Sequence, residues 1–254
     1  MCGIVGYLGE RDSLPIILNG LKRLEYRGYD SSGIAVHNGS TIASCKSKGK
    51  ISKLEKQLEK RKNIHGGLGI GHTRWATHGE PNDVNAHPQF SNSKKLCLVH
   101  NGIIENYSTI KQKLIKEGFT FYSETDTEVL VNLIEFIKDK HNVKLGEAVQ
   151  ISLNQVVGAY AIAVINNDKP DEIVVAKLGS PLCIGIGEDE HFIGSDVTPF
   201  IEFTKDVVYL EDGELAVIRN HKDTFFRKIS DDSSISPIVR KLELSLKFSN
   251  NGGY

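Results

Sequence analysis

The second residue of the chain, Cys2, combines two groups that could take part in a reaction. Removal of Met1, which is usual before a small residue, would leave Cys2 with both a thiol and a free α-amine. A terminal amine titrates near ~7.7–8.0 and a thiol near ~8.5, so each can exchange a proton with the other around neutral pH. One residue would then supply a nucleophile and its base, as in enzymes with an N-terminal threonine. The alternative is a cysteine that occupies position 2 by chance.

A second group of reactive side chains lies in residues 72–81, directly after an apolar strand segment expected at residues 68–70. This loop holds Arg74, the only tryptophan of the chain (Trp75), Thr77 and His78. The planar fork of an arginine suits a carboxylate. A structural turn around a half-buried tryptophan is the alternative, but so many hydrogen-bond donors favour a recognition loop.

A third group, His100-Asn101-Gly102, also follows an expected strand, at residues 96–99. The Asn101 amide and the Gly102 backbone N–H could together hold a developing oxyanion, and each such donor contributes about 10²–10³ in rate. An ordinary Asn-Gly turn is the alternative.

A fourth group, residues 123–128, stands at an expected helix start and includes Asp126. Carboxylates in a first helical turn usually cap the helix or complement its dipole. A ligand-binding role for Asp126 is the second interpretation.

Four histidines at residues 72, 78, 87 and 100 raise the question of a metal site. They form no H-E-x-x-H motif and no pair spaced by four residues, so we expect no metal.

The elements that would position these groups indicate an α+β fold. Hairpin signals at Asn38-Gly39 and at residues 166–171 predict antiparallel pairing. The glycine-rich residues 65–71 lack a dinucleotide-binding spacing and fit a strand packed close to another backbone. Strands separated by helices, with hairpin connections, favour layered antiparallel sheets over a doubly wound parallel sheet. We expect strands at residues 4–8, 33–36, 41–46, 68–73, 96–100, 160–165, 172–177 and 215–219, and helices from residue 13 onward, at 51–58, from Ser108 to Gly118, at 127–138 and at 145–156.

Composition narrows the class of protein. The 254 residues carry a formal net charge of −1, which argues against a nucleic-acid or anionic-membrane surface. The longest apolar run, residues 159–165, is far shorter than the ~18 residues of a membrane span. The N-terminus shows no signal-peptide pattern, and the four cysteines are spread singly without a disulfide framework. We therefore expect a cytoplasmic protein without nucleic-acid or membrane partners.

Taken in chain order, the four groups and the run Arg-Leu-Glu-Tyr-Arg-Gly-Tyr-Asp-Ser at residues 23–31 resemble the class II glutamine amidotransferases. The opening Cys-Gly-Ile-Val-Gly is shared by much of that class. The run at residues 23–31 and the sequence His-Thr-Arg-Trp-Ala-Thr-His-Gly-Glu-Pro are narrower, and are similar to the glutaminase half of the glucosamine-6-phosphate synthases. The resemblance extends over nearly the whole chain, including residues 179–182 and 210–214.

The resemblance implies a fold, a reaction and roles for particular residues. The fold would be the four-layer αββα arrangement of N-terminal nucleophile hydrolases, with two antiparallel sheets between helical layers. The reaction would be hydrolysis of L-glutamine to glutamate and ammonia through a thioester on Cys2. Asn101 and Gly102 would form the oxyanion hole, Arg74 would bind the glutamine carboxylate, and Asp126 its α-ammonium group.

Further roles follow from the same resemblance. Thr77 and His78 would line the glutamine pocket, Trp75 would belong to a mobile loop over it, and Arg27 would help to order the N-terminal strand. No cofactor is expected.

The resemblance also implies a division of the chain and further partners. Residues 1–229 would be the glutaminase domain, and residues 230–254 a linker towards a missing sugar-phosphate isomerase half. Fructose 6-phosphate would act only through that half, and the full-length enzyme would be a homo-oligomer.

Three alternatives remain open at this point. The chain could be the amidotransferase half of a purine-pathway or asparagine-forming enzyme, although residues 23–31 argue against this. It could be an N-terminal cysteine hydrolase of acyl amides, which a pair of Arg74 and Asp126 matched to an amino acid disfavours. It could also be a regulatory domain that binds an amino acid without turning it over, which would leave Cys2 unexplained.

Overall fold

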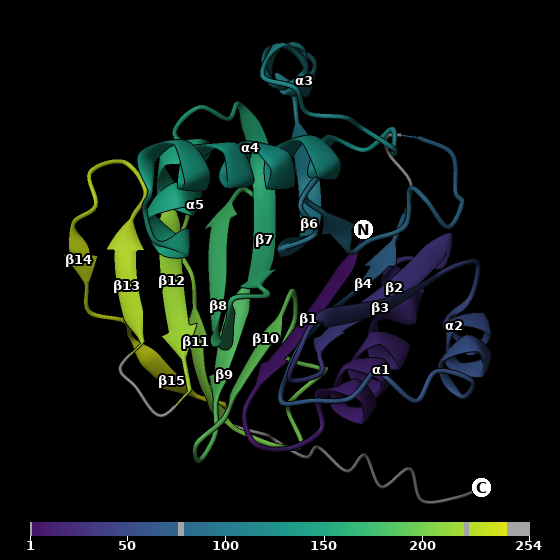
Figure 1. Cartoon of the computed structure of the whole chain (residues 1–254). Coiled ribbons are helices and arrows are strands. Elements are labelled where there is room, and N and C mark those ends of the chain that lie inside the picture. Colours follow the sequence, from purple (N-terminus) through teal and green to yellow (C-terminus); the bar gives the residue numbers. More distant parts are fainter. Residues whose placement is uncertain (1, 76–78, 221–223, 243–254) are drawn as a thin grey trace, which may run out of the picture.

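The computed structural model describes residues 2–75, 79–220 and 224–242. These residues form four layers: two antiparallel β-sheets lie face to face, and helices cover the outer face of each sheet (Figure 1). The predicted α+β fold, with two antiparallel sheets between helical layers, is therefore confirmed.

The first sheet has eight strands among the described residues, in the order β15-β11-β9-β10-β1-β4-β2-β3. All the pairs in this sheet are antiparallel. Its strands are β1 (Gly3–Leu8), β2 (Ser31–His37), β3 (Ile42–Lys48), β4 (Leu68–Arg74), β9 (Cys183–Ile186), β10 (His191–Gly194), β11 (Asp206–Tyr209) and β15 (Val239–Lys241).

The second sheet has seven strands among the described residues, in the order β14-β13-β12-β8-β7-β6-β5, and its pairs are also antiparallel. Its strands are β5 (Gln89–Phe90), β6 (Leu96–Ile104), β7 (Gly158–Asn166), β8 (Lys169–Leu178), β12 (Glu214–Arg219), β13 (Phe225–Lys228) and β14 (Ser234–Ile235).

The helices divide between the two outer layers (Figure 1). Helices α1 (Ser13–Leu24) and α2 (Ile51–Leu58) pack on the eight-stranded sheet, and the short 3₁₀ helix η1 (Glu25–Arg27) continues from α1. Helices α4 (Asp126–His141) and α5 (Leu145–Leu153) pack on the seven-stranded sheet, and α3 (Tyr107–Lys116) packs against α4.

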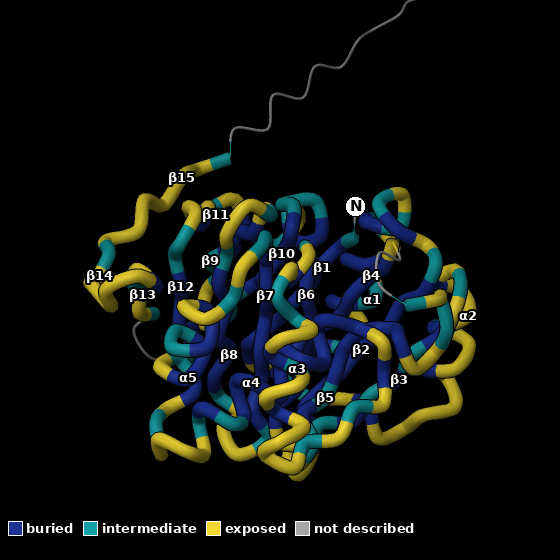
Figure 2. Tube along the Cα trace, turned by 90° about the horizontal axis from the view of Figure 1, so that it is seen from above, coloured by how far each residue is buried: buried dark blue, intermediate teal, exposed yellow. Residues whose placement is uncertain are grey.

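Strands in the middle of each sheet are buried on both faces (Figure 2). In β1, Ile4 and Leu8 join the core between the sheets, whereas Val5 and Tyr7 join the core under α1 and α2. This alternation follows from the two-residue period of a strand, and it explains why these strands read as nearly continuous apolar runs.

The same alternation decides where polar residues of β4 point. Leu68 and Ile70 lie in the core between the sheets. His72 and Arg74 have the same parity, so they continue that face as the strand reaches its end. The residues on the opposite face of β4 are small because α1 approaches closely: a Cβ on Gly71 would lie 2.5 Å from the side chain of Ile17.

Strand β6 differs from the expectation in its length. The pattern predicted a strand ending at His100, but pairing with β7 continues through Ile104. Asn101 and Gly102 therefore lie inside a paired strand, opposite Ala161 and Tyr160. An Asn-Gly pair usually signals a turn, and here the long neighbouring strand overrides that signal.

The start of α3 also differs. Ser108 was expected to cap it, but the helix begins at Tyr107 with Asn106 as its N-cap residue. The Asn106 side chain makes no cap bond, because it donates to Gln155 O and accepts from Val157 N–H instead. At α4 the N-cap is Thr125, which accepts from the N–H of Glu128.

Seven strands, β5, β9, β10, β11, β13, β14 and β15, were not predicted. Each has two to four residues, which is too short for a clear alternation. Two of them, β14 and β15, lie in the segment predicted to be a linker and pair with β13 and β11. The boundary between residues 229 and 230 stays a prediction. Among the described residues, no helix combines the length and the apolar character needed to cross a membrane.

Candidate active site

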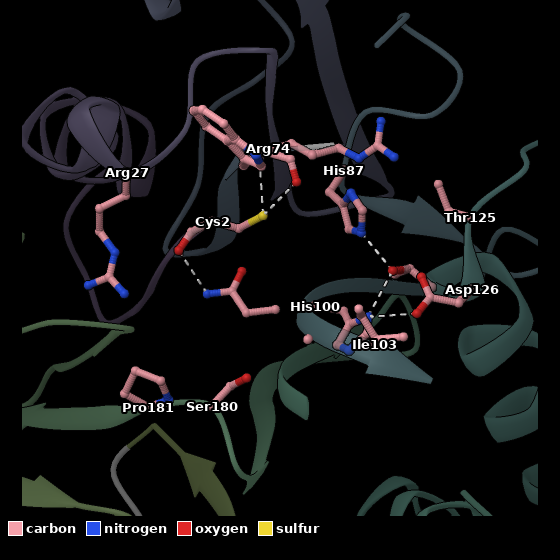
Figure 3. A pocket seen from close by; sticks show the side chains of 14 residues that line it. Cys2, Arg27, Arg74, His87, His100, Ile103, Thr125, Asp126, Ser180 and Pro181 are labelled. Atoms are coloured by element: carbon pink, nitrogen blue, oxygen red, sulfur yellow. Dashed lines mark hydrogen bonds and ion pairs between the residues drawn. The ribbon is translucent and has the colours of Figure 1, made fainter. Parts of the chain in front are cut away.

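A cavity of about 230 Å³ lies where β1, β4, β6 and the start of α4 meet. Its lining includes seven of the residues selected from the sequence, and Figure 3 shows several of them around the Cys2 thiol. These seven are Cys2, Arg27, Arg74, Trp75, Asn101, Gly102 and Asp126. They come from both sheets and from a helix, so the fold brings together groups that are far apart along the chain.

Cys2 precedes β1, and its sulfur is held by the neighbouring end of β4. The register pairs Gly3 with Thr73, which places Cys2 beside the segment that follows. The N–H of Trp75 donates to Cys2 Sγ at 3.1 Å, and Sγ lies 3.4 Å from Trp75 O. Burial raises the pKa of the Cys2 thiol, and the Trp75 N–H and the Arg74 cation oppose this effect. The resting group is therefore a thiol that needs a base before it can attack.

Asn101 lies across the cavity from β1 and contacts the Cys2 backbone. Its Nδ2 donates to Cys2 O at 3.1 Å, and its Oδ1 lies 2.9 Å from His72 Nε2. The neighbouring Gly102 has a φ of 123°, and a Cβ there would lie 2.1 Å from Ala159 O. Only glycine fits this position, because another residue would be strained and would also collide with β7.

Two charged side chains lie at another part of the same lining. Arg74 is 3% exposed, and its Nη2 donates to Gly79 O at 3.2 Å. Burial lowers the pKa of this guanidinium, and the negative charges of the Asp126 carboxylate and of Cys2 in its thiolate form oppose this effect. Asp126 Oδ2 accepts the N–H of Ile104 at 2.8 Å, and this bond holds the start of α4 to the end of β6. A buried cation and a buried anion thus line one cavity, as a zwitterionic ligand requires.

Of the other four residues predicted to belong to the site, the structure describes two. Trp75 is 47% exposed at the cavity mouth, and its ring meets Tyr29 edge to face at 5.7 Å. Arg27 lines the cavity, and its Nη1 lies 3.5 Å from Asp196 Oδ2. Thr77 and His78 lie outside the described residues.

Comparison with known proteins identifies the family. A family model described as "Glutamine amidotransferase domain" matches residues 46–231, more than half of the chain. The chain belongs to this family.

Curated members of the family give high identity over the full length of this amidotransferase chain. It is 54% identical to a glutamine–fructose-6-phosphate aminotransferase (isomerizing) of Bacteroides thetaiotaomicron over 257 aligned residues. It is 50% identical to a protein of the same name from Chlorobaculum tepidum. In both comparisons the match covers 100% of this chain and 41% of the relative, so the chain spans less than half the length of these relatives.

Solved structures agree on the fold of the amidotransferase domain. Glutamine phosphoribosylpyrophosphate amidotransferase from B. subtilis superposes with a TM-score of 0.77 at 29% identity, covering 91% of this chain and 50% of that one. A structure titled as the allosteric regulatory enzyme of purine biosynthesis gives the same TM-score at 31% identity, covering 91% of this chain and 49% of that one. The predicted resemblance to class II glutamine amidotransferases is confirmed.

The sequence interpretation of this amidotransferase domain missed several residues at the site. Ser195 accepts the N–H of Ile4 on its Oγ at 3.0 Å and donates its own N–H to Ile4 O at 3.1 Å, which fixes the chain two residues after Cys2. Thr127 Oγ1 lies 2.6 Å from His87 Nε2 and 3.1 Å from His100 Nδ1. Ser195 gave no signal in the sequence, because its partner is 191 residues away.

His72 is a further missed residue, and it did give a signal. It occupies a position that the alternation of β4 assigns to the core between the sheets, and a polar side chain buried there needs a partner.

In the described part of the chain, no cluster of three or more His, Cys, Asp or Glu residues has the arrangement of a metal site.

Proposed function

We propose that this domain hydrolyses L-glutamine to glutamate and ammonia, with Cys2 as the nucleophile once Met1 has been removed. The observation that carries the proposal is that the Cys2 thiol, the Asn101 amide and the charged pair of Arg74 and Asp126 line one cavity. By analogy with the relatives' names, a longer protein containing this domain would use the ammonia to aminate fructose 6-phosphate.

The chemistry begins with attack of Cys2 Sγ on the side-chain amide carbon of glutamine, while the α-amine of Cys2 accepts the thiol proton. The developing oxyanion receives hydrogen bonds from Asn101 Nδ2 and the Gly102 N–H. The C–N bond then breaks, and the proton passes from the α-amine to the leaving nitrogen. Ammonia departs, and a thioester between Cys2 and the glutamyl group remains. Water hydrolyses the thioester, which releases glutamate and restores the thiol.

The other predicted residues would bind glutamine or hold the site together. Arg74 would bind the α-carboxylate and Asp126 the α-ammonium group, while Trp75, Thr77 and His78 would cover and line the pocket. Arg27 supports the N-terminal strand indirectly, because its partner Asp196 is next to Ser195, which bonds to Ile4. We also propose the division into a glutaminase domain (1–229) and a linker (230–254), a homo-oligomeric longer protein and a cytoplasmic location.

The three alternatives fit the observations less well. A purine-pathway enzyme is disfavoured by identities of 29% and 31% to such structures, against 54% to the fructose-6-phosphate aminotransferase. A hydrolase of acyl amides would not use a buried cation and anion in one pocket. A domain that only binds an amino acid would not need a thiol held beside an amide donor.

The direct test is to assay the purified chain with glutamine, with and without fructose 6-phosphate. We expect release of glutamate and ammonia but no amino sugar, because no glycine-rich loop before a helix offers a phosphate site among the described residues. We also expect no stimulation by the sugar phosphate. Trp75 is the only tryptophan, so its fluorescence should respond to glutamate and not to fructose 6-phosphate.

The control for this assay is the Cys2→Ala chain prepared in the same way. Any glutamate or ammonia that it releases measures contaminating glutaminase and is subtracted from the wild-type value. Absence of glutamate and ammonia from the wild-type chain without Met1 would contradict the proposal. A saturable fluorescence response to the sugar phosphate, or any amino-sugar product, would show that the chain does more than we propose.

A second set of variants separates binding from chemistry. Arg74→Ala or Asp126→Ala should raise KM about ten- to a hundredfold, because each loses a charge-assisted hydrogen bond to a part of glutamine that does not react. Asn101→Ala should instead lower kcat, by about 10²–10³, because its amide acts mainly on the oxyanion. Steady-state kinetics gives both constants.

The matched control is Arg227→Ala, which removes an exposed ion pair with Asp232 away from the cavity and should leave both constants unchanged. An Asn101→Ala variant with unchanged kcat and only a higher KM would reverse the assigned roles.

A further inference from the structure

We propose that His72 is a positioning residue, which holds the Asn101 amide with its NH₂ group directed at the Cys2 side of the cavity. The inference rests on the proposed function, in which that NH₂ group donates to the oxyanion. His72 itself does not line the cavity, so it would act only through Asn101.

The two side chains meet between the sheets. His72 lies on the face of β4 that carries Leu68 and Ile70, and Asn101 lies on the face of β6 that carries Cys97 and Val99. All four apolar residues belong to the core between the sheets. His72 Nε2 lies 2.9 Å from Asn101 Oδ1 and 3.0 Å from the backbone oxygen of His100.

The neighbours of His72 fix which of its nitrogens carries the proton. The backbone oxygen of His100 can only accept a hydrogen bond, so Nε2 must be a donor. The same N–H then faces the amide oxygen of Asn101 and leaves Nδ2 to donate to Cys2 O at 3.1 Å. If the amide turned over, two donors would face each other at Nε2 and two acceptors at Cys2 O.

The surroundings keep His72 in this state. Its side chain is fully buried, with 0% exposure, and its ring stacks on that of His87 at 4.4 Å. Burial lowers the pKa of His72 to about 3, which the bond to Asn101 opposes only in part, so the ring is neutral at physiological pH. Within the described residues Nδ1 has no hydrogen-bond partner, and no group there competes for the proton.

A purely structural role is the other explanation for a histidine in this core. The two explanations differ in what happens to kcat when only the donor at Nε2 is removed. A structural role affects folding and leaves the active fraction with normal kinetics, whereas a positioning role lowers kcat and leaves glutamine binding intact.

The test uses a matched pair of variants. In His72→Gln the side-chain amide nitrogen can reach the place of Nε2, and in His72→Asn the side chain is one carbon shorter and cannot. We expect His72→Gln to keep most of the wild-type kcat. We expect His72→Asn to lose about 10- to 100-fold in kcat, which is less than removal of the oxyanion donor itself, with little change in KM. Equal kcat values for the two variants would overturn the proposal.

Two further measurements keep the test decisive. Adding His72→Asn to Asn101→Ala should cause no additional loss, since the positioned group is already gone, and independent losses that multiply would overturn the proposal. If His72→Asn does not fold, nitrogen NMR of the wild-type histidines still reports the tautomer. A neutral ring protonated at Nε2 supports the inference, and protonation at Nδ1 overturns it.

Failure of the proposed function would look different. Wild-type protein without glutaminase activity, or with activity that survives Cys2→Ala, would refute the function of the site. Normal, Cys2-dependent turnover in His72→Asn would refute only the role of His72.

Discussion

Cys2→Ala is expected to abolish glutamine hydrolysis, with turnover falling by more than about 10³-fold because the nucleophile is lost. The fold and the affinity for glutamine should remain close to wild type, since Arg74 and Asp126 carry the proposed binding contacts. Turnover measured as ammonia release, together with Trp75 fluorescence titrated with glutamate, gives both quantities on one sample.

Labelling offers an independent check of the nucleophile. An electrophilic glutamine analogue should alkylate Cys2 alone, because Cys45, Cys97 and Cys183 are buried and burial raises the pKa of each of their thiols. The matched control is Cys45→Ala, which removes a buried thiol away from the cavity and should keep turnover and labelling. Labelling of one of the three buried thiols would contradict the assignment of Cys2 as the nucleophile.

Retention of Met1 is expected to leave the protein nearly inactive. The nitrogen of Cys2 would then belong to a peptide bond, which cannot accept the thiol proton near neutral pH. The structure makes this requirement stricter, because burial raises the pKa of the Cys2 thiol and so keeps it protonated. The measurement is turnover of a sample whose intact mass shows Met1, before and after trimming by an aminopeptidase.

Trimming should restore activity to the wild-type sequence and not to Cys2→Ala, which serves as the control for nonspecific effects of the treatment. Full turnover in protein that retains Met1 would rule out the terminal amine as the base.

Local sequence patterns determined the fold class and the types of chemical group at the site. The apolar alternation of the strands and the three-to-four spacing of the helices depend only on which faces are buried. Tight-turn residues such as Asn38-Gly39 then made neighbouring strands antiparallel. The chemistry of single side chains then pointed to the site residues, because each of these groups has only a few roles in catalysis or binding. They are the thiol of Cys2, the guanidinium of Arg74, the amide of Asn101 and the carboxylate of Asp126.

The tertiary structure decided which of these groups meet and in what state. Periodicity reports that a face is buried, but it does not say which surface covers it, so the contact of His72 with Asn101 across 29 residues had no local signature. The bond from Ser195 to the N-terminal strand spans 191 residues and depends on β10 lying beside β1. The length of β6 was likewise set by its partner β7, which kept Asn101 and Gly102 inside the sheet. Burial then fixed the protonation of Cys2 and His72, because the cost of a charge depends on the surroundings that the whole fold supplies.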